Sequence, residues 1–110
     1  MSLPRVVVFG SINMDLVAKT PRLPKPGETL IGHSFSTIPG GKGANQAVAI
    51  ARLNIPTVMI GRVGKDSFGQ ELLQSLQSAK VQIEDILVDE SVNSGVALIA
   101  VDDYGENSGC

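Results

Sequence analysis

The sequence predicts a layered α/β fold with a parallel sheet, and three features of the 110-residue chain indicate it. Short apolar runs alternate with longer segments in β-α-β-α-β order, which is the order of a parallel sheet with crossover helices. The apolar runs are continuous, as strands buried on both faces are. The longer segments carry apolar residues at i, i+3, i+4 and i+7, which is the period of an amphipathic helix.

Three apolar runs predict the strands of the parallel sheet. The first is Val6–Phe9, which is followed by Gly10, and the second spans residues 57–63. A third strand is expected at residues 86–88. We expect both faces of these strands to be buried, because helices cover both faces of a parallel sheet.

The first predicted helix spans residues 44–53 and ends at residues 54–56, Asn-Ile-Pro. One of its faces consists of small residues, which allow close packing on a sheet. These residues are Ala44, Ala47, Val48 and Ala51.

The second predicted helix begins near Ser67. Ser67 and Gln70 have the spacing of a capping box, and Asp66 is a competing cap. The apolar stripe of this helix is expected to pack in the core. It consists of Phe68, Leu72, Leu73, Leu76 and Ala79.

Other segments mix apolar and polar residues and predict strands that are exposed on one side. Two of them, residues 16–20 and 29–38, are separated by a proline-rich segment that prevents a helix and favours turns. A longer apolar run at 96–101 is followed by residues 102–105, which are typical of a hairpin turn. The returning strand would begin at residues 106–108, where the chain stops, so we expect a truncated domain.

Composition argues against several classes of function. The formal net charge is −2, so no basic surface is expected to bind nucleic acid. No apolar run reaches the roughly 18 residues that a membrane span needs, and the N-terminal apolar run is too short for a secretory signal. Cys110 is the only cysteine and His33 the only histidine, so we expect no disulfide, no metal site and a reducing, cytoplasmic location.

A glycine-rich segment at residues 38–47, Ile-Pro-Gly-Gly-Lys-Gly-Ala-Asn-Gln-Ala, precedes the first helix. Backbone N–H groups at a helix N-terminus attract anions and polar oxygens, and a lysine and an asparagine add side-chain donors. Gly43 stands where a Walker A loop requires Ser or Thr, and Gln46 stands where the dinucleotide fingerprint requires glycine. The segment therefore predicts a pocket for an oxygen-rich ligand, and a purely structural turn is the alternative.

Asn13 and Asp15 follow the first predicted strand, at the edge where open α/β sheets bind their ligands. In an extended chain the two side chains share a face. A carboxylate that accepts hydrogen bonds and an amide that donates and accepts them suit a polyol, and an ordinary turn is the alternative. The junction at residues 61–66 is expected to be structural.

Five segments of the chain resemble the N-terminal part of the ribokinase family, which belongs to the phosphofructokinase-B type of carbohydrate kinases. They are Gly-Ser-Ile-Asn-Met-Asp at 10–15, Pro-Gly-Glu-Thr at 26–29, Gly-Gly-Lys-Gly-Ala-Asn-Gln-Ala at 40–47, Gly-x-Val-Gly-x-Asp-x-Phe-Gly at 61–69 and Ser-Gly-Val-Ala-Leu-Ile at 94–99. The resemblance implies a three-layer α/β/α fold with a small β-sheet lid, and lid strands at about 16–38 and 94–108. Residues 1–110 would be the N-terminal part, and the catalytic, ATP-binding part would be absent.

The resemblance also implies a reaction, the ATP-dependent phosphorylation of D-ribose to D-ribose 5-phosphate in the cytoplasm. Mg²⁺ and a monovalent cation such as K⁺ would assist, and the lid would pair two subunits as a homodimer. ATP and both cations would be bound outside this chain. The residues that would bind the sugar are Asn13, Asp15, Gly41, Lys42, Gly43 and Asn45, with Ala97 and Ile99 on the lid face against it.

The chain departs from the family in one respect that bears on catalysis. The catalytic aspartate of the family lies in a downstream Gly-Ala-Gly-Asp motif, which this sequence lacks. We therefore expect no catalytic residue in this chain, a binding task for Asp15 and no activity of the chain alone. The alternatives are a sister kinase acting on fructose, a deoxysugar or a nucleoside, and a non-catalytic module for sugar binding or dimerisation.

Overall fold

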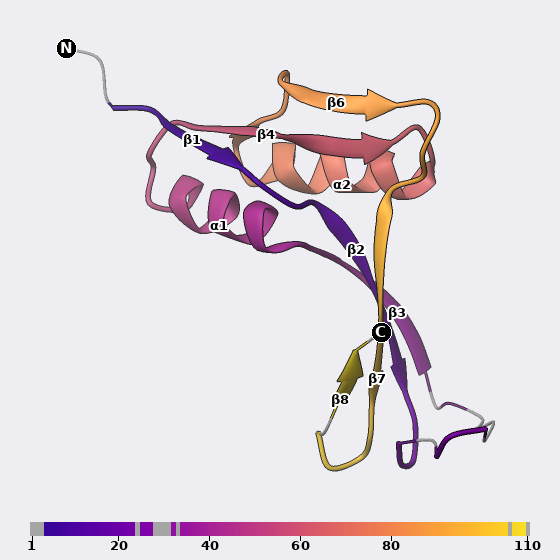
Figure 1. Ribbon diagram of the computed structural model, residues 1–110. Helices are drawn as coiled ribbons and strands as arrows, with labels where there is room; N and C mark the ends of the chain where they lie inside the picture. Colours follow the sequence, from indigo (N-terminus) through magenta and orange to yellow (C-terminus); the bar gives the residue numbers. More distant parts are fainter. Residues whose placement is uncertain (1–3, 24, 28–31, 33, 106, 110) are drawn as a thin grey trace. The chain divides into compact units, whose positions relative to one another are not determined.

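The computed structural model describes residues 4–23, 25–27, 32, 34–105 and 107–109 (Figure 1). The chain divides into two compact units. The first comprises residues 1–14 and 39–95, and the second comprises residues 15–38 and 96–110.

A parallel sheet forms the centre of the first unit (Figure 1). β4 pairs in parallel with β1 on one side, and on the other with β5 by its first residues and β6 by its last. This arrangement confirms the predicted α/β class and parallel sheet. The strands are β1 (Val6–Phe9), β4 (Thr57–Gly64), β5 (Val81–Gln82) and β6 (Ile86–Asp89).

Two helices, α1 (Lys42–Ala51) and α2 (Ser67–Ser78), pack on one face of this sheet. α1 contacts β1 and β4, whereas α2 contacts β4 and β5, and the two helices together line a small cavity. The crossovers β1-α1-β4 and β4-α2-β5 advance in the same direction across the sheet, so right-handed connections place both helices on the same side. Of the three layers of the expected α/β/α fold, the described residues thus form two, the sheet and one helical layer.

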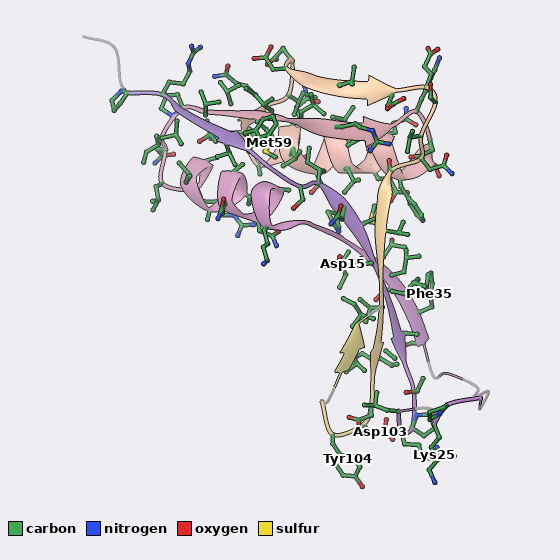
Figure 2. All side chains as sticks on the ribbon, viewed as in Figure 1. Asp15, Lys25, Phe35, Met59, Asp103 and Tyr104 are labelled. Carbon is green, nitrogen blue, oxygen red and sulfur yellow. The ribbon has the colours of Figure 1, made fainter. Side chains whose placement is uncertain are left out.

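The core lies between the sheet and the two helices. Met59 (Figure 2) and Val63 of β4 are fully buried there, and the predicted alanine face of α1 meets them with Ala44, Ala47 and Ala51. Small side chains on the helix allow this close approach, as the sequence predicts. Of the stripe predicted for α2, Leu72 and Leu76 are buried, whereas Phe68, Leu73 and Ala79 are half-buried.

The predicted burial of the strands on both faces is wrong for β1 and β6. Phe9 is 83% exposed and Val7 52% exposed, while Val8 between them is buried. In β6, Leu87 and Val88 are exposed and Ile86 is buried. Alternate side chains of a strand point to opposite faces, and in the described residues only one face of the sheet carries helices.

The second unit is built on a four-stranded sheet in the order β3-β2-β7-β8. β7 and β8 are antiparallel and the turn between them is closed by the Gly105 N–H, which donates to the Asp102 carbonyl at 3.1 Å, so the predicted hairpin is confirmed. The predicted strand at 29–38 is described only from residue 34, and residues 28–31 and His33 lie outside the described residues, as do Glu106 and Cys110. The strands are β2 (Asn13–Lys19), β3 (Ser34–Gly40), β7 (Gly95–Val101) and β8 (Asn107–Gly109).

Helix ends differ from the prediction for local reasons. α1 begins at Lys42, two residues before the predicted start, because Gly41 completes the turn into the helix. The predicted Ser67–Gln70 capping box is wrong: Asp66 is the N-cap of α2, and its carboxylate accepts the Gly69 N–H at 2.7 Å. β5 was not predicted, because a two-residue strand has no periodicity to read.

One strained backbone position suggests a stabilising substitution. Lys80 follows the end of α2 with φ at 67°, in the left-handed region that favours glycine. We expect Lys80→Gly to raise the free energy of unfolding by about 0.5–1 kcal/mol, since the strain removed exceeds the added chain entropy of glycine. Urea unfolding measures the change, and Lys80→Ala, which keeps the strain, should give no gain. A loss of stability in Lys80→Gly would contradict the prediction.

Candidate functional site

The turn before α1 has a conformation that only glycine adopts readily. Gly41 has φ 100° and ψ 136°. A Cβ on Gly41 would lie 2.6 Å from the Ser11 carbonyl oxygen and 3.0 Å from the Asn13 backbone nitrogen. The turn therefore lies directly against the segment that leads from β1 into β2, and a side chain at this position would separate them.

The first turn of α1 packs on the same segment. A Cβ on Gly43 would lie 2.7 Å from the carbonyl carbon of Gly10 and 2.8 Å from the Ser11 nitrogen. The Ala44 N–H donates to the Ser11 carbonyl at 3.0 Å, which fixes the start of the helix on the end of β1. The glycines predicted as binding residues thus also allow two backbone segments to meet.

Two backbone N–H groups at the start of α1 have no hydrogen-bond acceptor among the described residues. The Asn45 N–H donates to the Gly41 carbonyl at 2.9 Å, and the Ala44 N–H is taken by Ser11. The N–H groups of Lys42 and Gly43 make no hydrogen bond to any residue that the structure describes, and neither a capping side chain nor an acidic residue lies in the first turn. These donors, the positive end of the helix and the exposed Lys42 side chain suit a ligand rich in oxygen.

Asn13 lies beside this turn. The Asn13 backbone nitrogen is one of the atoms that a Cβ on Gly41 would approach, and the Asn13 side chain is half-buried. A Cβ on Gly95 would lie 2.6 Å from the Asn13 Oδ1, so the carboxamide rests on the backbone at the start of β7. The structure therefore brings Asn13 together with Gly41 and with Gly95, a neighbour that the sequence reasoning did not single out although it lies in the 94–99 motif.

Three of the predicted residues belong to the second unit, namely Asp15, Ala97 and Ile99. Asp15 is half-buried on β2 (Figure 2), and strand alternation turns its side chain to the same side of β2 as Asn13. Ala97 and Ile99 are half-buried and alternate with Val96 and Leu98, which are exposed, so they share one face of β7. Their role against a sugar stays a prediction.

Asn45 has a different setting from the other predicted residues of α1. Its side chain is exposed, and Asn45 lines a cavity of about 30 Å³ together with Pro39 of β3 and Leu72 of α2. Within the described part of the chain no hydrogen bond joins its side chain to Asn13 or Lys42. The structure thus places Asn45 one turn into the helix without bringing it onto Asn13.

The junction between β4 and α2 is held by a dense set of hydrogen bonds. Asp66 accepts from the Ser94 backbone N–H at 2.8 Å, from the Ser94 hydroxyl at 2.7 Å and from the Gly69 N–H. The bonds from the backbone N–H groups of Ser94 and Gly69, followed by that from the Ser94 hydroxyl, lower the pKa of Asp66, and Arg62 adds a smaller effect. The Ser94 hydroxyl in turn accepts the Gly64 N–H at 2.9 Å, so the predicted structural junction also reaches the start of β7.

The loop after β6 is tied to β4 by a second set of contacts. The Arg62 Nε donates to Asp89 Oδ2 at 3.0 Å, and its Nη2 donates to the Asn93 carbonyl at 3.0 Å. Hydrogen bonds lower the pKa of Asp89. The bond from the Ser91 N–H has the largest effect, and the bond from Arg62 has a smaller one. The Arg62 side chain therefore anchors residues 89–94 to β4 at two points, at Asp89 and at Asn93.

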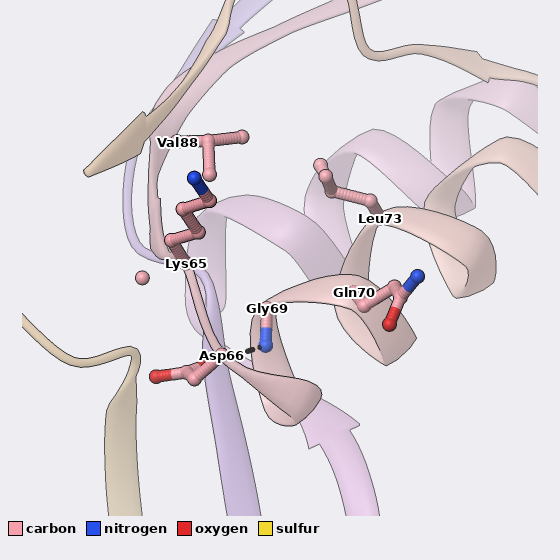
Figure 3. A pocket seen from close by; sticks show the side chains of 7 residues that line it. Lys65, Asp66, Gly69, Gln70, Leu73 and Val88 are labelled. Atoms are coloured by element: carbon pink, nitrogen blue, oxygen red, sulfur yellow. Dashed lines mark hydrogen bonds between the residues drawn. The ribbon is translucent and has the colours of Figure 1, made fainter. Parts of the chain in front are cut away.

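A hollow of about 380 Å³ adjoins the β4–α2 junction (Figure 3). Its charged side chains are already engaged, because Asp66 accepts the bonds described above and Lys65 Nζ lies 3.1 Å from Glu90 Oε1. None of the predicted binding residues lines it, so we place the candidate site at the glycine turn, where donors are available. The hollow is lined by Gly64, Lys65, Asp66, Gly69, Gln70, Leu73 and Val88.

Two features that bear on metals and membranes are absent from the described residues. Their aspartate and glutamate side chains form no group of three or more that could hold a metal ion. No helix among them has the length and apolar character needed to cross a membrane.

Comparison with known proteins gives one consistent result. A family model described as pfkB family carbohydrate kinase matches residues 3–110. A ribokinase of Lactococcus lactis is 53% identical over 85 residues, which are 76% of this chain and 28% of the relative, and a ribokinase of Schizosaccharomyces pombe is 47% identical over 93% of this chain and 34% of its own length. The structure of Arabidopsis thaliana ribokinase complexed with ribose and ATP matches with a TM-score of 0.86 at 36% identity, over 100% of this chain and 36% of that one. The chain thus spans about a third of the length of the relatives it matches.

Proposed function

The chain belongs to the pfkB family of carbohydrate kinases, and on this premise we propose that it is the sugar-binding part of a ribokinase. The reaction of the whole protein would be the transfer of the γ-phosphoryl group of ATP to the 5-hydroxyl of D-ribose. The ribokinase relatives and the ribose complex of a similar structure support this choice of sugar. We also propose a cytoplasmic location, because ATP is available there as the phosphoryl donor.

One observation carries the proposal, the meeting of the glycine turn with Asn13. The turn leaves the Lys42 and Gly43 N–H groups without a described acceptor, and it lies against the backbone of Asn13. A sugar offers several hydroxyl oxygens within a few ångströms, so it can accept from backbone donors while it also bonds to a carboxamide. An ionised phosphate could accept from the backbone donors and from the carboxamide NH₂ group, but it offers the carboxamide oxygen no donor, whereas a sugar hydroxyl does.

Each residue would have a distinct task in sugar binding. The Asn13 carboxamide would donate to one hydroxyl and accept from a neighbouring one, and the Asp15 carboxylate would accept from two adjacent hydroxyls. Lys42 would add a charged donor, and Asn45 would approach as the loop of residues 41–45 closes on the sugar. Ala97 and Ile99 would cover the apolar face of the sugar and keep out water, which competes with the sugar hydroxyl for the phosphoryl group.

The remaining parts of the reaction would come from the rest of the protein. Phosphoryl transfer needs a base, in-line positioning and neutralisation of the phosphate charge. The described residues contain no group of three or more acidic side chains that could hold a metal ion, and the sequence has no Gly-Ala-Gly-Asp motif. We propose that the 110-residue chain alone is inactive, and that its second unit acts as the lid and pairs with a second subunit.

The activity of the chain tests this assignment. The purified chain is mixed with ribose, ATP, Mg²⁺ and K⁺, and ribose 5-phosphate is measured. We expect no turnover, and formation of ribose 5-phosphate at a substantial rate would contradict the proposal that the catalytic part lies elsewhere.

Asn13→Ala tests sugar binding by the chain. Removal of a carboxamide that makes two hydrogen bonds to the sugar should weaken ribose binding by about 10- to 100-fold. Isothermal titration calorimetry with ribose, 2-deoxyribose and fructose measures the affinities and separates a ribokinase from its sister kinases. Gln74→Ala, which removes an exposed carboxamide from α2, is the matched control. Equal affinities of wild type and Asn13→Ala would refute the role of Asn13.

A further inference from the structure

The Asp66–Ser94 pair has a position that a simple helix cap does not require. An N-cap needs only the hydrogen bond that Asp66 Oδ1 accepts from the Gly69 N–H at 2.7 Å. Asp66 makes two more bonds, both to Ser94, a residue 28 positions further along the chain. Ser94 is 6% exposed, so its hydroxyl and its backbone N–H depend on these partners.

Ser94 is followed at once by Gly95, the backbone neighbour of the Asn13 carboxamide. With its N–H and its hydroxyl both bonded to Asp66, and the hydroxyl also accepting from Gly64, Ser94 is fixed at three points. Because Gly95 is joined to Ser94 by a peptide bond, its position is restricted as well. A Cβ on Gly95 would lie 2.6 Å from Asn13 Oδ1. A shift of Gly95 toward Asn13 would collide with the carboxamide, and a shift away would remove its support.

We propose that Asp66 and Ser94 are positioning residues that set the orientation of the Asn13 carboxamide through Gly95. The proposal rests on the proposed function for the ligand of Asn13, which is a sugar. Neither residue touches the sugar. They act through the rigid start of β7, and all four residues belong to the first unit.

Two substitutions separate this role from the helix cap. Asp66→Asn keeps a good N-cap, because the amide oxygen can still accept from Gly69, but it places an NH₂ group where the Ser94 N–H needs an acceptor. Ser94→Ala keeps the backbone bond and removes the hydroxyl that bridges Asp66 and Gly64. Ser91→Ala is the matched control, because Ser91 is exposed in the same loop and bonds only through its backbone N–H.

The first readout does not need a sugar. In ¹H–¹⁵N NMR spectra of the whole chain, the side-chain NH₂ signals of Asn13, assigned from their loss in Asn13→Ala, report the setting of the carboxamide. We expect them and the Gly95 amide signal to shift in Asp66→Asn and Ser94→Ala and to stay in place in Ser91→Ala. Unchanged signals in a folded Asp66→Asn or Ser94→Ala chain would overturn the proposal, and Asp66→Asn keeps the test available if Ser94→Ala does not fold.

The second readout is the affinity for ribose. We expect Asp66→Asn and Ser94→Ala to weaken binding roughly tenfold, the equivalent of about one hydrogen bond, at temperatures where both chains are fully folded. Leu76→Val, destabilised in the core of α2, should bind as the wild type does when folded. Wild-type affinity in both variants would overturn the positioning role. A wild-type chain that binds no ribose would refute the proposed function of the isolated chain, while the NMR signals would still decide the positioning role.

Discussion

Gly43→Ala is expected to destabilise the first unit by about 1–3 kcal/mol and to abolish ribose binding, although the residue lies in a helix. Helix propensity alone predicts the opposite, a gain of about 0.5–1 kcal/mol, because alanine is the better helix former. The difference comes from the backbone of Gly10 and Ser11, which a Cβ would approach to 2.7 and 2.8 Å. The Gly10 N–H donates to the Ile60 carbonyl at 3.2 Å and the Ser11 carbonyl accepts the Ala44 N–H, so this backbone cannot move aside as a flexible side chain can, and the helix start must separate from residues 10–11.

Urea unfolding followed by circular dichroism measures the loss of stability, and calorimetry with ribose measures the loss of binding. Gln46→Ala is the matched control, because Gln46 is exposed on the same helix and should change stability by less than about 0.5 kcal/mol. A Gly43→Ala chain that is as stable as the wild type would show that α1 does not depend on the close approach to β1.

The order of the elements other than β5 was predictable because each of them is encoded locally. The apolar run of β4 and the alanine face of α1 are patterns within single segments, and their periods are set by strand and helix geometry. The burial of β1 was not predictable in the same way. Whether Phe9 is covered depends on what packs on the far face of the sheet, and a run of apolar residues carries no information about that.

The contacts around the glycine turn were only partly predictable from the sequence. Asn13 and the glycines at 41 and 43 were identified from residue chemistry and resemblance. The reason for the glycines, the close approach of the turn to residues 10–13, depends on contacts between distant segments that spacing does not reveal. Gly95 and the Asp66–Ser94 bonds were missed for the same reason, although both lie in motifs that the sequence displays.

Leu72→Ala is expected to give the largest loss of stability among single truncations of α2, about 2–5 kcal/mol. Leu72 is 1% exposed, and it lines the small cavity between α2 and α1 with Ala44 and Val48. Truncation enlarges a cavity that is lined by both helices and by residues 12, 39 and 40, so the cost of the cavity adds to the lost burial. Domains of this size are commonly stable by only about 5–15 kcal/mol, so the loss is a large fraction of the total.

Leu73→Ala provides the matched control, because the same side chain is removed one residue along the helix where it is only half-buried. We expect it to cost less than half as much in urea unfolding. Leu72→Ala should leave the site itself unchanged. The Lys42 and Gly43 N–H groups stay on α1, so the folded fraction of this variant should bind ribose with wild-type affinity. If ribose affinity fell in the fully folded Leu72→Ala chain, the packing of α2 would have to set the start of α1, and the glycine turn would not be sufficient to hold the site.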